Sequence, residues 1–437
     1  MADISNLTGS FLSGHAVVDY GVQLGDTRNL SVITGENVAI VQRSNITSEI
    51  NAPTHVVSHV LTSDSNYTDM LLKSVMAQGT PRIFMRLGIV AGKDHFYLPF
   101  QEHIVTHFFS APFQHGHRIE IHSKDRMWEI SRADNKVRAR RGKISDIVQV
   151  IAQENGLRFI IEPTRGTGND VYIQSHEDDI EFILGRLLPR AVNDKGRGSY
   201  RLFIRDNVLH FHAPDYQAEV RQVNYFSSST SVFLVTRDWT QSLVNNGAAG
   251  CVGIVYDPYT GTAETIMSSP NVVLNFGKVT PRLAEIRNGK VPLRYHLGTN
   301  RVDEVVALVQ NQYEHAYSKL YEVELKMEKM PVIQVNDILN IIICSEAIAS
   351  PWAGYYVVNK VEHHLNSGAL SSTFSLSRGE LNTSSTQFKT GATGLLTREN
   401  FVTGEAINVN VIASSKQVGG QTEQTTDGQV IKQVIKV

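Results

Sequence analysis

The residues best suited to chemistry are six histidines that cluster within 28 positions: His95, His103, His107, His115, His117 and His122. Imidazoles at short spacings are common zinc ligands, and His103 and His107 would share one face of a helix. However, no cysteine accompanies them, and two prolines interrupt the segment. His115 and His117 would fall on one side of a strand, as a solvent-facing or interface pair would. The sequence therefore predicts no metal site and no cofactor.

Adjacent carboxylates are the second candidate for chemistry. Asp178, Asp179 and Glu181 lie close together, and a glycosidase needs two carboxylates, one of them in an apolar pocket. These acids fall at the expected start of a helix, where acids favour the positive end of the helix dipole. No Gly-x-Ser-x-Gly, His-Glu-x-x-His or phosphate-loop motif occurs. The sequence therefore predicts no catalytic residue, and a protein that is not an enzyme.

A basic run is the third candidate. It contains Arg138, Arg140 and Arg141. Contact with nucleic acid is one interpretation, but a net charge of -2 gives the chain no general basic field for tight binding. A solvated face, or ion pairs with acids on a neighbouring subunit, is favoured. The three arginines are therefore predicted interface residues.

Length and composition indicate what must position these side chains. The chain has 437 residues, 41% of them hydrophobic and 19% charged, which predicts two to four folded domains. No run of ~20 apolar residues occurs, so no membrane insertion is expected. The first residues lack a basic and an apolar region, so no signal peptide is expected. For Cys251 and Cys344, two buried thiols are favoured over a disulfide.

Residues 1–135 are predicted to be mostly strand, because short β-prone runs alternate polar and apolar residues. The expected strands are at 37–41, 82–87, 117–122 and 127–130. One helix is expected near 67–76.

Residues 136–215 predict a small α+β unit. A helix at 143–152 has an apolar stripe, and Gly156 suits its left-handed cap. Strands are expected at 157–161 and 170–174, and a second helix is expected to start at Ser175. A hairpin is expected at 200–212, around Arg205-Asp206-Asn207.

Residues 216–380 are again predicted to be strand-rich, with a long helix at about 299–319. From residue 381 to 437, Ser, Thr, Gly and Gln dominate, which predicts an extended tail without a core of its own. The end of the tail is nevertheless apolar and strand-prone, so it is predicted to dock on a partner. The predicted contact residues are Val430, Ile431, Val434, Ile435 and Val437.

Three segments resemble one family, the central hub proteins of contractile phage tails, which are related to the N-terminal part of type VI secretion spike proteins. The first is the unit at 137–190, with Glu154-Asn155-Gly156-Leu157, an Asp178-Asp179 pair leading a helix, and Leu187-Leu188-Pro189. The second is the hairpin at 200–212. The third is the run from 302 to 378, in which a long helix is followed by strands, one of them beginning Gly354-Tyr355-Tyr356-Val357. Where the family often has Pro-Gly-Asp, this chain has Val335-Asn336-Asp337, and Asn can replace Gly at a positive backbone angle.

The resemblance implies an α+β, mainly β fold. Two β-barrel tube domains, at 1–135 and 216–380, would flank the inserted α+β domain at 136–215, with the tail at 381–437. It also implies a homotrimeric hub that joins a sixfold tail tube to a threefold spike.

The partners would be the spike, the tube or a tube initiator, and baseplate wedge proteins, with DNA only in transit. The protein would be made in the host bacterial cytoplasm and located in the tail baseplate of the virion. Two alternatives stay open: a tail component that binds or degrades peptidoglycan, and a type VI spike-like protein.

Overall fold

The computed structural model describes most of the first half of the chain and separate strands of the second. The described residues are 14–23, 30–32, 39–62, 73, 81–113, 116–133, 135–194, 198–214, 221–226, 232–235, 251–257, 262–267, 293–297, 307–308, 311, 321–328, 333–344, 354–378, 408–410 and 432–434. The helix expected near 67–76 lies outside them except for Lys73, which is helical. The helix expected at 299–319 also lies outside them, except for the helical Ala307, Leu308 and Asn311.

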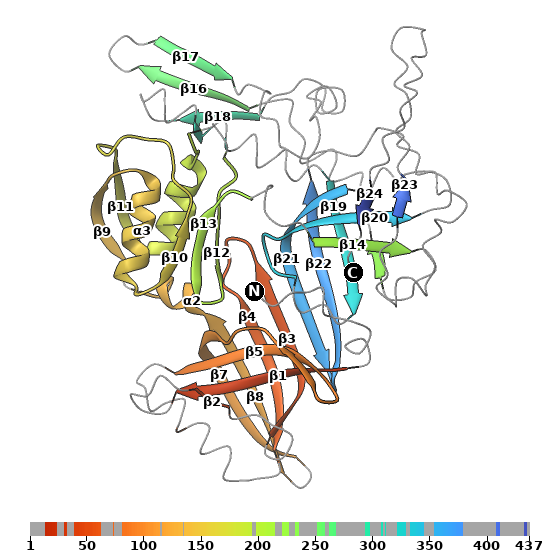
Figure 1. Ribbon diagram of the computed structural model, residues 1–437. Coiled ribbons are helices and arrows are strands. Elements are labelled where there is room, and N and C mark those ends of the chain that lie inside the picture. Colours follow the sequence, from red (N-terminus) through yellow and green to blue (C-terminus); the bar gives the residue numbers. More distant parts are fainter. Residues whose placement is uncertain are drawn as a thin grey trace, which may run out of the picture.

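A long, mainly antiparallel sheet dominates the described residues (Figure 1). Its N-terminal strands are β1 (His15–Gln23), β2 (Leu30–Val32), β3 (Ala39–Glu49), β4 (His55–Thr62), β5 (Arg82–Ala91), β6 (Asp94–Tyr97), β7 (Gln101–Phe113) and β8 (Gly116–Asp125). Its C-terminal strands are β14 (Arg221–Phe226), β15 (Val232–Val235), β19 (Tyr321–Glu328), β20 (Ile338–Cys344), β21 (Gly354–Asn366) and β22 (Ala369–Arg378). The mainly β class expected from the sequence is confirmed.

One seam joins the two ends of the chain within this sheet. The strand order is β15-β19-β22-β21-β3-β4-β8-β7-β5-β1-β2, and β21 pairs antiparallel with β3, with Asn45 opposite His364. Among the described strands this path is open rather than closed into two rings. β1 nevertheless folds back toward the β21–β22 turn, where the Ala16 amide donates to the Gly368 carbonyl at 2.8 Å.

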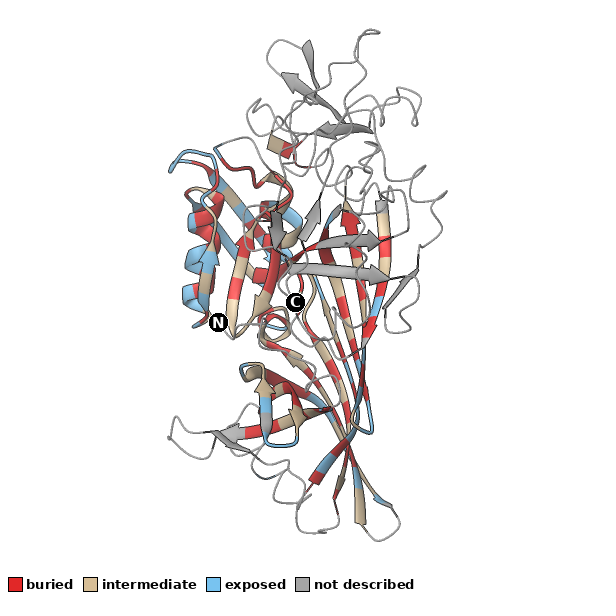
Figure 2. Cartoon of the chain, turned by 45° about the vertical axis from the view of Figure 1, so that its right-hand side comes forward, coloured by how far each residue is buried: buried red, intermediate tan, exposed pale blue. Residues whose placement is uncertain are grey.

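Two apolar clusters lie on the inner side of the sheet. In β4 every second residue is buried, so Val56 and Val60 enter the first cluster with Tyr20 and Ile119. The second cluster lies under β19, β21 and β22. Figure 2 shows these buried positions alternating with less buried ones along the strands. Period-two alternation therefore sends the remaining side chains to the opposite face.

The inserted module contains two small sheets and short helices beside the long sheet (Figure 1). β9 (Lys136–Arg141) pairs with β11 (Val171–Glu177), and β10 (Arg158–Ile161) pairs with β13 (Val208–His212), which pairs with β12 (Arg201–Arg205). The helices are α2 (Arg126–Ile130), α3 (Ile144–Glu154) and α4 (Asp179–Phe182). A π-helical turn (Ile183–Leu187) and a 3-10 turn (Leu188–Arg190) follow α4.

Most local predictions for the module are confirmed. The stripe of α3 is buried, Gly156 has a φ of 64°, and the hairpin turns at Asp206 and Asn207, both with positive φ. The strands expected at 157–161 and 170–174 correspond to β10 and β11. In the loop that precedes β20, outside the module, Asn336 has a φ of 66°, as expected for a residue that replaces glycine.

Two element predictions were wrong, and an aspartate cap explains each. Residues 127–130 belong to helix α2, because the Asp125 carboxylate accepts from the Met127 amide at 3.0 Å. The second helix starts not at Ser175 but at Asp179. Strand β11 continues to Glu177, and the Asp178 carboxylate accepts from the Ile180 and Glu181 amides.

The β12–β13 hairpin ties the module to both ends of the long sheet. The Asn207 carboxamide accepts from the Glu102 amide at 2.6 Å and donates to the Phe100 carbonyl at 2.8 Å. Arg205 pairs with Asp337 at 2.7 Å. Phe203 enters the second apolar cluster. The module is thus built into the long sheet rather than attached at one point.

Two further sheets are small. β16 (Cys251–Asp257), β17 (Thr262–Met267) and β18 (Leu293–Leu297) form one, and β23 (Asn408–Asn410) pairs with β24 (Lys432–Val434) in the other. In the described part of the chain, no helix combines the length and apolar composition needed to cross a membrane.

Candidate functional site

A continuous polar face covers the outer side of the long sheet. We define this polar face by the outward side chains of β19, β22, β21, β3, β4, β8 and β7. One row of register partners crosses six of these strands: Ser371, His364, Asn45, Val57, His122 and His107. The face therefore continues through the seam between the N-terminal and C-terminal strands.

The first part of this face is the histidine half, on β4, β8 and β7. His107 and His122 are register partners with ring centroids 5.0 Å apart, and His55 lies 6.0 Å from His122. The Glu120 carboxylate contacts His122 Nε2 at 2.6 Å and His59 Nδ1 at 3.7 Å. One carboxylate is thus placed between two imidazoles.

Three cations lie on the same face as these imidazoles. They are Arg43 on β3, opposite His59, and Arg118 and Lys124 on β8. The hydrogen bond from His122 lowers the pKa of Glu120. Burial and the neighbouring Arg118 lower the pKa of His59, and burial and Lys124 lower the pKa of His55. These shifts favour the neutral imidazole on His55 and His59.

The structure separates His103 from His107, which the sequence placed on one helix face. His103 and His107 lie on one strand and not on a helix, and the bulge between Val105 and His107 sends them to different surroundings. His103 is fully buried, whereas His107 is exposed. His115 lies outside the described residues. Among the described residues, no three or more His, Cys, Asp or Glu side chains are arranged to hold a metal ion.

Sequence analysis missed His55 and His59, because they lie more than 35 residues before the cluster. The sequence pattern that could have identified them is the alternation of β4, which places both histidines on the side opposite to Val56 and Val60. Register then places His59 beside Glu120.

The second part of the polar face is the balanced half, on β19, β21 and β22. It forms a groove of about 350 Å³ lined by Glu324, Lys326, Lys360, Glu362, His364, Ser371, Thr373 and Ser375. Each acid has a cation two residues along its own strand. Lys360 contacts Glu362 at 2.6 Å, and Lys326 contacts Glu324 at 3.6 Å. Its fixed charges therefore cancel locally.

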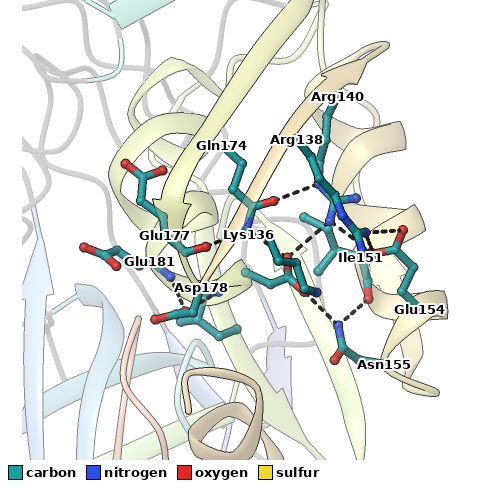
Figure 3. Close-up of polar contacts among 12 residues, drawn as sticks. Lys136, Arg138, Arg140, Ile151, Glu154, Asn155, Gln174, Glu177, Asp178 and Glu181 are labelled. Atoms are coloured by element: carbon teal, nitrogen blue, oxygen red, sulfur yellow. Dashed lines mark hydrogen bonds and ion pairs between the residues drawn. The ribbon is translucent and has the colours of Figure 1, made fainter. Parts of the chain in front are cut away.

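The module contains a third charged cluster, which is buried (Figure 3). The Asp179 side chain is fully buried and accepts from Lys136, from Arg140 at 3.2 Å and from Gln174 at 3.1 Å. Burial raises the pKa of Asp179, but hydrogen bonds from Lys136, Gln174 and Asn155 outweigh it, so the pKa is lowered. An acid that the sequence placed at a helix start is thus the centre of an internal ion-pair network.

Two of the three predicted interface arginines contact this network. Arg140 is 8% exposed and pairs with Asp179 and Glu154, and Arg138 reaches Glu154 at 3.3 Å. Arg141 is exposed, and it donates to the Asn169 carboxamide at 2.8 Å. The interface role of these residues stays a prediction.

Apolar side chains lie beside Arg141 on the outer face of the β9–β11 sheet. Val137, Val171 and Ile173 are 64%, 53% and 61% exposed. Register places them on one face, because Val137 pairs with Ser175, Ala139 with Ile173 and Arg141 with Val171. Exposed apolar side chains grouped in this way are typical of a contact surface.

The predicted tail residues are mostly outside the described part. Val430, Ile431, Ile435 and Val437 lie outside it, and Val434 belongs to β24, where it pairs with Asn408. The docking role of the tail stays a prediction.

Comparisons with known proteins give matches in structure only. No protein-family model matches the sequence, and no curated protein matches it. The fold is similar to that of a tail protein from Neisseria meningitidis MC58, with 9% identity, a TM-score of 0.51, and coverage of 83% of this chain and 97% of that one. The 43 kDa tail protein of prophage MuSo2 from Shewanella oneidensis gives 9% identity, a TM-score of 0.50 and coverage of 83% and 100%.

A chain of the Francisella PdpA–VgrG complex is also similar, with 8% identity and a TM-score of 0.51 over 97% of this chain and 66% of that one. The resemblance stated from the sequence is thus confirmed at the level of the fold. The chain has the fold of phage tail and spike-like structural proteins.

Proposed function

We propose that this protein is the central hub of a phage tail baseplate, a homotrimer that joins the sixfold tail tube to the threefold spike and surrounds the DNA passage. The observation that carries the proposal is the seam between β3 and β21, which makes the two strand-rich parts of the chain one sheet with one polar face. Three such chains would supply six tube-like units to a ring. The fold likeness to tail proteins over 83% of the chain supports this assignment.

The hub acts through interfaces and not through catalysis. The exposed apolar face at Val137, Val171 and Ile173, with Arg141 beside it, is a surface for contact with a neighbouring subunit or a wedge protein. Spike-like function is the second candidate, because the likeness to a chain of the PdpA–VgrG complex covers 97% of this chain.

The mass of the purified protein in solution tests the hub proposal. We expect a closed trimer of three 48.6 kDa chains, because rings of identical subunits close by rotational symmetry. Light scattering or native mass spectrometry at micromolar concentration measures this directly. A monomer that the cognate spike also fails to assemble would contradict the proposal.

The tail supplies a second test. We expect a chain truncated after Arg378 to remain folded and trimeric but to lose the spike in a pull-down, because the apolar end of the tail would add strands to its partner. Spike binding with unchanged affinity would assign the tail another role.

A further inference from the structure

The histidine half of the polar face has a charge composition that the hub proposal does not explain. A passage that only guides DNA needs no cluster of titratable groups. Yet four imidazoles gather there from three strands: His55 and His59 from β4, His107 from β7 and His122 from β8. The imidazole is the side chain whose charge changes between about pH 5 and 8.

The fixed charges around these imidazoles are mostly positive. Those that face them from the packed strands are Arg43 and the acid Glu49 on β3, and Arg118, Lys124 and the acid Glu120 on β8. Beyond β3, the nearest charged side chains of the face are on β21, where Glu362 and His364 are 3.8 Å apart. At the α2 end of β7, Glu102 is paired with Arg82. Three fixed cations therefore face two carboxylates, one of which His122 already contacts.

We propose that the histidine half binds the phosphate backbone of single-stranded nucleic acid, and that binding takes up protons, so that affinity rises as the pH falls. A phosphate placed among imidazoles stabilises their protonated form, and each protonated imidazole adds one counterion-releasing contact. The carboxylates of the patch offset part of its fixed positive charge, so the surface holds a polyanion weakly when the imidazoles are neutral. Each imidazole that takes up a proton adds one positive charge to the same surface.

An aromatic side chain supports nucleic acid over an acidic protein as the occupant. Phe109 is 53% exposed and is the register partner of Glu120, within the same patch as the imidazoles. A positively charged surface with exposed rings is how proteins hold single strands, because every base has a face that stacks. The choice of nucleic acid also rests on the proposed function, which places DNA near this protein.

Fluorescence anisotropy of a labelled single-stranded DNA of about 20 nucleotides tests the proposal on the full-length protein. At constant ionic strength we expect binding to tighten about tenfold or more between about pH 7.5 and about pH 5.5. Circular dichroism at each pH confirms that the fold is retained. An affinity that does not change with pH would overturn the proposal.

Variants locate the effect. His55→Gln, His59→Gln, His107→Gln and His122→Gln combined should abolish most of the pH dependence, whereas the control His364→Gln, in the balanced half, should keep it. Glu120→Gln removes the acid and should tighten binding about threefold at neutral pH, a change that does not depend on whether the fourfold variant folds. Retained pH dependence in a folded fourfold variant, or unchanged binding in Glu120→Gln, would contradict the assignment.

Two comparisons separate this proposal from its alternatives. Poly-glutamate that binds as tightly as DNA, with the same pH dependence, would overturn nucleic acid as the occupant. The mass measurement does not involve DNA, so the two proposals can fail separately. A trimer whose DNA binding does not change with pH would contradict the DNA-binding proposal and leave the hub proposal standing. A monomer whose DNA binding changes with pH would contradict only the hub proposal.

Discussion

The two halves of the polar face balance charge in different ways. In the balanced half each glutamate contacts a lysine two residues along its strand, so the charge of each acid is neutralised locally. In the histidine half a single carboxylate contacts imidazoles, and no ion pair among the described residues joins Arg43, Arg118 or Lys124 to an acid. The alternation of side chains along the strands thus makes one continuous surface. The residues on its two halves differ, so acids are paired with lysines in one half and with imidazoles in the other.

The Asp179 cluster shows how charges are balanced when the acid is fully buried. Its carboxylate has cation and amide partners and no contact with solvent, whereas the acids of the polar face are partly exposed. The cost of removing an acid should therefore follow burial and not the number of cations nearby.

The largest expected effect is that of Asp179→Ala. We expect the free energy of unfolding to fall by about 3–5 kcal/mol, because the variant leaves the buried Arg140 and the nearby Lys136 without their carboxylate. Urea unfolding followed by circular dichroism measures the change.

Glu181→Ala is the matched control, since Glu181 is an exposed acid in the first turn of the same helix. We expect a loss below about 1 kcal/mol. Equal losses in the two variants would mean that the Asp179 network adds nothing beyond an acid at a helix start.

A smaller effect should come from a histidine buried beneath the sheet. Burial lowers the pKa of His103 to about 4, and neither ring nitrogen has a hydrogen-bond partner among the described residues. As the pH falls, His103 therefore becomes protonated in the unfolded chain before it does in the folded protein. Its contribution to the free energy of unfolding is fully present above about pH 6.5 and is lost as the pH falls toward 4. The loss amounts to about 2–3 kcal/mol.

His103→Phe should reduce this acid sensitivity. We expect the difference in unfolding free energy between about pH 7 and about pH 4.5 to shrink by about 2 kcal/mol, while any packing change shifts both values equally. His210 and His363, whose pKa values burial also lowers to about 4, should retain the rest of the loss. A variant with the full acid sensitivity of the wild type would show that His103 is not the group that titrates.

Local sequence signals predicted the module better than they predicted the polar face. The stripe of α3, the cap at Gly156 and the turn at Asp206 and Asn207 each depend on residues close in sequence, so they could be identified from the chain alone. The helix-start error at Ser175 has the same origin, because two polar residues competed as caps within one short stretch. Asp178 is the cap because its carboxylate reaches two amides.

The polar face depends on register between distant strands, which no local pattern encodes. The pairing of Asn45 with His364 joins residues 319 positions apart, and the pairing of His59 with Glu120 joins residues 61 apart. Tertiary pairing also decided the role of Asp179, which the sequence could place only at a helix start. Asp179 is buried in an ion-pair network because Lys136 and Arg140, which are distant in sequence, contact its carboxylate.

The smallest expected effect lies in the balanced half. Lys360 and Glu362 are about one-third exposed, so solvent screens their attraction, and we expect Glu362→Gln to cost less than about 1 kcal/mol at any pH near neutrality. A double-mutant cycle with Lys360→Gln isolates the pair, and we expect a coupling energy below about 1 kcal/mol that decreases with added salt. The same substitution at Glu120 is the informative contrast, because it should leave stability little changed and alter DNA affinity. A coupling energy above about 2 kcal/mol in the Lys360–Glu362 cycle would show that this pair behaves like the buried Asp179 cluster, and burial would then no longer separate the two kinds of charge.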